Sequence, residues 1–137
     1  MDIRSFRRQT KPEWVSPGPD YGDVEILCRP LGFDYIDEQA KLLRVAARKA
    51  GGEDRISSAD RAALNVEAMI KTGLVDVRGL VDNGNPVTFA QFCDLLRQPE
   101  FGELANLAMA ACGAAGRVRQ DDMEEAAGNS GGASAST

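Results

Sequence analysis

LVDVRGLVDNGNPVTFAQFCDLL, residues 74–96, holds the signals for a strand, a turn and a helix in direct succession. Leu74–Val81 is a short apolar run that charged residues and a glycine interrupt. Asp82–Pro86 is a dense turn signal, which fits either a hairpin or a link from a strand to a helix. Thr88–Gln91 matches a capping box and predicts a helix through about residue 97. The expected inward positions of that helix are Phe89, Phe92, Cys93 and Leu96.

Two amphipathic helices are predicted before this stretch. The first extends from about Asp34, a credible N-cap, to Ala50, with a pair of glycines after it. Its apolar positions recur at helical spacing and are Ile36, Ala40, Leu43 and Ala47. The second is about 15 residues long and opens with the capping-box pattern Ser57–Asp60. Gly73 follows its end.

A short strand and an extended arm are predicted at the N-terminal end. Residues 23–31 alternate apolar and polar side chains, which indicates a strand that Pro30 ends or confines to a sheet edge. Residues 1–22 contain several prolines and should form an extended arm. Its Trp14 and Tyr21 either attach the arm to the body or bind a partner. The arm is locally basic through Arg4, Arg7, Arg8 and Lys11.

A last helix and a polar tail complete the chain. Pro99 fits the first turn of this helix. Its apolar face is Phe101, Leu104, Ala105, Ala108, Ala111 and Cys112. The alanines would allow close approach of a neighbouring helix. Residues 117–137 are too polar to bury a core, and we expect them to be disordered.

The predicted fold class is therefore mainly α (α+β). A short N-terminal strand or hairpin is followed by about four amphipathic helices and a disordered C-terminal tail. We expect residues 23–116 to form a single domain, because a chain of 137 residues is too short for two well-buried cores.

No set of residues suited to catalysis, a metal or a cofactor is found in the sequence. There is no histidine, and the three cysteines lie far apart, so neither a zinc site nor a histidine-activated nucleophile can be assembled. The glycine pair at residues 51–52 precedes acidic residues, which is unsuited to binding phosphate. We expect a protein that is not an enzyme, with its cysteines reduced and packed as small apolar residues.

Charge and hydropathy restrict the partners further. The formal net charge of -5 argues against a general nucleic-acid binder, although the basic arm could contact nucleic acid. No apolar run approaches the roughly 18 residues of a membrane span, and the N-terminus lacks a signal-peptide core. We therefore expect a protein of the cytoplasm that does not enter a membrane.

The stretch from Val77 to Val87, VRGLVDNGNPV, resembles a feature of the tail assembly chaperones of long-tailed bacteriophages and related prophage or gene-transfer-agent particles. In that family a segment with a similar glycine, aspartate and proline pattern precedes a capped helix. The resemblance covers roughly residues 23–116 and includes the order of strand, helices and turn.

The resemblance implies that the protein binds the tape measure protein and keeps it soluble during tail tube assembly. It also implies self-association, activity in the cytoplasm of the bacterial host and absence from the mature virion. A longer product made by frameshifting could contact the tail tube protein. Apolar grooves between amphipathic helices would bind the client.

The expected partner-binding residues lie on the second and the last predicted helix. They are Val66, Met69, Ile70, Phe101, Leu104 and Leu107. The alternative for each is an ordinary place in the core. Two other functions remain open, namely a small structural virion protein of the tail connector or baseplate, and a regulatory protein whose basic arm contacts nucleic acid.

Overall fold

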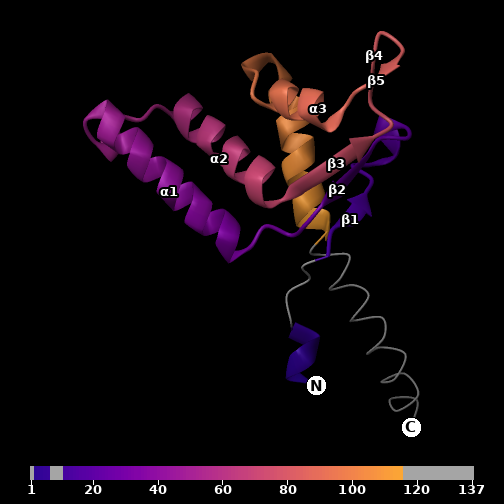
Figure 1. Cartoon of the computed structure of the whole chain (residues 1–137), viewed down its shortest axis with the longest axis horizontal. Helices are drawn as coiled ribbons and strands as arrows, with labels where there is room; N and C mark the ends of the chain where they lie inside the picture. Colours follow the sequence, from indigo (N-terminus) through magenta and orange to yellow (C-terminus); the bar gives the residue numbers. More distant parts are fainter. Residues whose placement is uncertain (1, 7–10, 116–137) are drawn as a thin grey trace.

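The computed structural model describes residues 2–6 and 11–115 and confirms the predicted fold class (Figure 1). The helices are α1 (Phe33–Ala50), α2 (Ser58–Thr72), α3 (Phe89–Leu96) and a last helix that includes residues 102–115. The strands are β1 (Glu13–Val15), β2 (Glu25–Cys28), β3 (Leu74–Arg78), β4 (Val81–Asp82) and β5 (Asn85–Pro86). Short 3₁₀ turns are formed by Ile3–Phe6, Pro19–Tyr21, Glu53–Arg55 and Pro99–Phe101. The predicted disordered tail lies outside the described residues.

The main sheet has three antiparallel strands in the order β1-β2-β3. Ile26 of the central strand pairs with Val15 on one side and Val77 on the other. Ile26 and Cys28 are buried, which confirms the predicted alternation. The strand β1 belongs to the segment predicted to be an arm, so the folded domain begins before residue 23. A strand of three residues is too short to show an alternation in the sequence.

Trp14 attaches β1 to the rest of the sheet. The guanidinium of Arg78 on β3 lies 3.9 Å from the centroid of the indole ring. The same guanidinium makes an ion pair of 2.9 Å with Glu25 on β2. One side chain of β3 therefore links all three strands. Of the two interpretations of Trp14, the structure favours attachment to the body.

The stretch that follows β3 forms both a hairpin and a link to a helix. Asn83 and Gly84 have φ values of 49° and 82°, as the turn of a two-residue hairpin requires. This turn joins β4 to β5. Thr88 then caps α3, and its side chain and that of Gln91 form the predicted reciprocal capping box.

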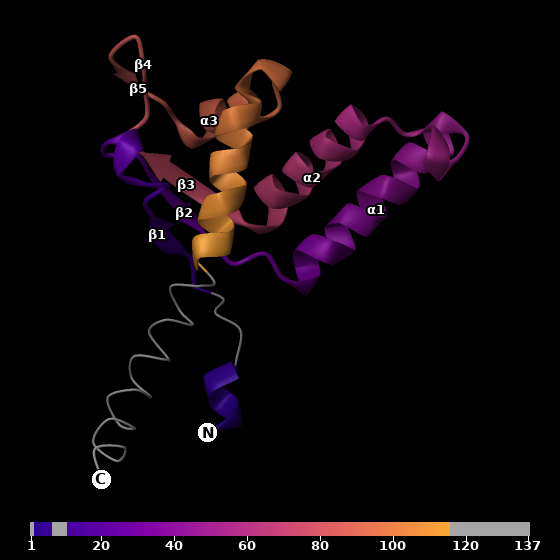
Figure 2. The ribbon, with the colours of Figure 1, turned by 180° about the vertical axis from the view of Figure 1, so that it is seen from behind.

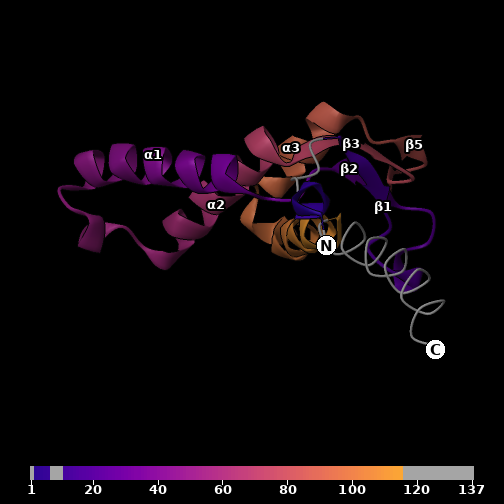
Figure 3. The same cartoon turned by 90° about the horizontal axis from the view of Figure 1, so that it is seen from below.

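The helices α1 and α2 form an antiparallel hairpin that projects from the sheet (Figures 1 and 3). Ser57 caps α2 by accepting a hydrogen bond from the Asp60 amide, as predicted. The prediction that Asp34 caps α1 is wrong, because the helix begins one residue earlier and Gly32 occupies the N-cap. Asp34 lies in the first turn, where its negative charge interacts favourably with the positive end of the helix dipole.

The core lies between the sheet, α3 and the last helix (Figure 2). The small buried face of the last helix comprises Ala105, Ala108, Ala111, Cys112 and Ala115. It joins a cluster that includes Ile26 and Val77 of the sheet as well as Phe92 of α3. The alanines therefore bring the helix close to a sheet, and not only to a helix as the sequence predicted.

Candidate partner-binding groove

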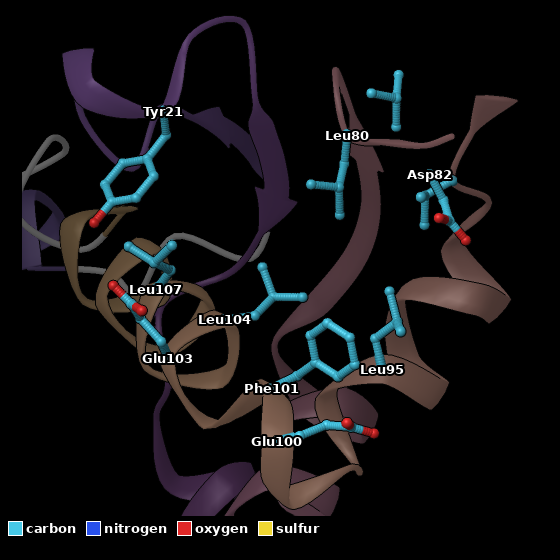
Figure 4. Close-up of a pocket in the computed structure, with 11 residues that line it drawn as sticks. Tyr21, Leu80, Asp82, Leu95, Glu100, Phe101, Glu103, Leu104 and Leu107 are labelled. Carbon is cyan, nitrogen blue, oxygen red and sulfur yellow. The ribbon is translucent and has the colours of Figure 1, made fainter. Parts of the chain in front are cut away.

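A groove of about 450 Å³ lies between the last helix, α3 and the β4–β5 hairpin. It is lined by Tyr21, Leu80, Val81, Asp82, Val87, Leu95, Glu100, Phe101, Glu103, Leu104 and Leu107. Figure 4 shows Phe101 between Leu95 and Leu104, with Leu80 across the opening from Leu104. Apolar side chains from four separate parts of the chain thus form one concave surface, which is the usual form of a binding site for an apolar group.

The chain turns sharply at the corner of the groove because of Pro99. Pro99 follows α3 and begins the 3₁₀ turn Pro99–Phe101. Proline is well tolerated there, because a backbone N–H at the first position of a helix would have no hydrogen-bond partner within the helix. The turn places Phe101 at the edge, with 36% of its surface exposed. Leu104 and Leu107 follow at helical spacing on the same side. The alanine face of this helix is thereby left to pack in the core.

The opposite wall of the groove is fixed by the hairpin. The Val87 amide donates a hydrogen bond of 2.9 Å to the Leu80 carbonyl and closes the base of β4 and β5. Val87 is buried, whereas Leu80 is partly buried and packs against the core. This wall of the groove is therefore held in place by the core and by the hydrogen bond at the base of the hairpin.

The charges around the groove are all of one sign. Asp82, Glu100 and Glu103 contribute carboxylates, and no lysine or arginine of residues 2–6 and 11–115 lines the groove. Figure 4 shows the carboxylates of Glu100 and Glu103 beside the last helix and that of Asp82 beside the hairpin. An apolar floor with an acidic edge suits a segment that has an apolar face flanked by basic residues.

The structure brings together three of the six predicted partner-binding residues, namely Phe101, Leu104 and Leu107. The three predicted on α2 do not join them. Met69 has no exposed surface and belongs to the core. Val66 and Ile70 are partly buried and pack against that core. Helical spacing identified an apolar face of α2, but this face packs in or against the core of the molecule.

Sequence reasoning missed five apolar residues of the groove, which are Tyr21, Leu80, Val81, Val87 and Leu95. They belong to three segments and share no common spacing. Leu80 and Val87 flank the predicted hairpin turn, so pairing of the hairpin ends was the one local signal that could have placed them side by side.

The three cysteines are free and buried, as expected for packing residues. Burial raises the pKa of the Cys93 thiol. A hydrogen bond to Cys28, together with burial, raises that of Cys112 well above its usual value. These two thiols therefore stay protonated at neutral pH, and thiolate chemistry is not available to them.

The described part of the chain has no group of three or more cysteine, aspartate or glutamate side chains placed to hold a metal ion. None of its helices is both long enough and apolar enough to cross a membrane. No family model, curated protein or solved structure matches the chain.

Proposed function

We propose that this protein is a phage tail assembly chaperone, which binds the tape measure protein and keeps it soluble while the tail tube assembles. The observation that carries this proposal is the apolar groove around Phe101, Leu104 and Leu107. The likeness of residues 77–87 to the family supports the tape measure protein as the client.

The groove has the properties needed to bind a helix of a long client. Apolar side chains spaced by one helical turn would occupy a floor made by Leu95, Phe101 and Leu104. The carboxylates at its edge would attract lysine or arginine beside those apolar residues. Each contact is small, so firm binding requires several chaperone copies along one client chain.

This function places the protein in the cytoplasm of the bacterial host and leaves it out of the finished virion. The tape measure protein is exposed only before the tube encloses it, so the groove has a client only during assembly. A longer frameshifted product would add a contact to the tail tube protein.

Co-expression with the tape measure protein of the same phage or particle tests the proposal. Phe101→Ser combined with Leu107→Ser should lower the soluble fraction of the client by roughly tenfold, because the apolar floor is lost. Phe101 and Leu107 lie in the groove but outside the core cluster, so the variant should fold. The matched control is Val45→Ser, which removes an exposed apolar residue on α1, far from the groove.

Two results would contradict the proposal. One is a client that is equally insoluble with and without the wild-type chain. The other is recovery of the chain in stoichiometric amounts by mass spectrometry of purified particles, which would identify a structural virion protein instead.

A further inference from the structure

The turn of the β4–β5 hairpin contains a pair of residues with reactive chemistry. Asn83 is the only asparagine of the chain that is followed by glycine. Asn83 and Gly84 are both exposed. Figures 1 and 2 show the hairpin at the periphery of the molecule, so water has access to the turn.

An asparagine that precedes glycine can react with its own backbone. The backbone nitrogen of the glycine attacks the side-chain carbonyl carbon, a new C–N bond closes a cyclic imide, and the side-chain nitrogen leaves as ammonia. Water then hydrolyses either carbonyl of the imide and yields aspartate or isoaspartate. Glycine favours the first step because it has no side chain to obstruct the attacking nitrogen. The reaction consumes water alone, and it is one reason why asparagine is thermally labile.

The two reacting groups in this turn are not restrained by hydrogen bonds. Among residues 2–6 and 11–115, no group bonds to the Asn83 side chain and none accepts a hydrogen bond from the Gly84 amide. Nothing lies within 4 Å of a Cβ atom placed at Gly84. The hairpin has only two pairs of residues in register, and such a short hairpin opens readily. The turn can therefore reach the conformation that ring closure needs.

Asn85 in the same hairpin provides an internal comparison. It is also exposed, but Pro86 follows it. The nitrogen of proline carries no hydrogen and is already bonded to three carbon atoms, so it cannot close the imide. Asn65 and Asn106 lie in helices and do not precede glycine. The hairpin thus holds one reactive and one unreactive asparagine.

We propose that Asn83 is a site of spontaneous deamidation, whose product places a carboxylate in the hairpin turn beside the acidic edge of the groove. Asp82 already contributes a carboxylate to that edge, and the new charge follows it directly in the chain. An isoaspartate product also adds a carbon atom to the backbone of the turn. The pairing of Val81 with Pro86 then loses its register. Deamidation changes both the charge and the shape of this wall of the groove.

Peptide mass analysis of the protein after incubation at physiological temperature tests the proposal. Trypsin releases residues 79–97 as one peptide that contains both asparagines of the hairpin. We expect this peptide to gain about 1 Da, because a carboxyl group replaces an amide. Fragmentation of the peptide should place the gain at Asn83 and not at Asn85. The gain should be faster at alkaline than at neutral pH, since the attacking nitrogen must lose its proton.

Gly84→Ala is the matched variant. Its methyl group obstructs the attacking nitrogen and should slow the gain of mass at Asn83 by roughly tenfold or more. Unchanged far-ultraviolet circular dichroism will show that the variant is folded.

Hydrogen exchange tests the change of shape. The Val87 amide, which donates to the Leu80 carbonyl at the base of the hairpin, should exchange roughly tenfold faster in the aged protein that contains isoaspartate. Freshly prepared Asn83→Asp has the charge without the longer backbone, so its Val87 amide should exchange as in the wild type. Exchange at Val87 that does not respond to isoaspartate would contradict the change of shape.

Three results of the mass analysis would overturn the proposal: no gain of mass at Asn83 after prolonged incubation at alkaline pH, an equal gain at Asn85, or a Gly84→Ala variant that reacts as fast as the wild type. The reaction does not depend on a client, so its failure would leave the chaperone proposal standing.

Discussion

Gly79 and Gly84 have nearly the same φ angle but different surroundings. Their φ values are +81° and +82°. A Cβ atom at Gly79 would overlap the backbone of Asp23, where the chain enters the sheet, whereas nothing lies within 4 Å of one at Gly84. The requirement for glycine is therefore conformational at Gly84, and both conformational and steric at Gly79.

Alanine substitution at these two positions should separate the two requirements. Gly84→Ala should lower the free energy of unfolding by about 1 kcal/mol, the cost of positive φ alone. Gly79→Ala should lower it by about 3 kcal/mol or more, because backbone must also move. Urea denaturation monitored by Trp14 fluorescence measures both. If both variants lose the same free energy of unfolding, the backbone of Asp23 does not prevent a side chain at position 79.

At the scale of elements, two sets of contacts hold β1 in the sheet. The indole ring of Trp14 stacks against the guanidinium of Arg78, and three residues of β1 pair with β2. Trp14→Ala removes the stacking of Arg78 and should release β1 while β2 and β3 remain paired. We expect amide hydrogen exchange in residues 13–15 to become roughly tenfold faster or more. The amides between β2 and β3 act as the internal control. A uniform acceleration in all three strands would mean that Trp14 supports the whole fold.

The elements that the sequence predicted well are those whose signals are local. Ser57 and Thr88 act on amides within the next three residues, and both are the caps that were expected. Ile26 and Cys28 were found by alternation alone. The cap of α1 was misplaced because Asp34 is favourable in the first turn as well as at the N-cap, so residue type could not separate the two positions.

At the scale of the whole molecule, local signals no longer suffice. Met69 and Leu104 both lie at apolar helical positions, yet one is enclosed by the core and the other faces a groove. Which of them is covered depends on β2 and β3, strands from segments about 50 residues apart. Only half of the predicted partner-binding set therefore lies in the groove, and Tyr21 and Leu95 could not have been added to it from spacing.

Site-specific photocrosslinking tests directly whether the groove binds the tape measure protein. A photoreactive amino acid at Phe101 or Leu107 should crosslink to the client, because both side chains line the groove. The same group at Val45, exposed on α1, should not. We expect client adducts from the two groove positions alone. Adducts that form equally at Val45, or that are missing from both groove positions, would contradict it.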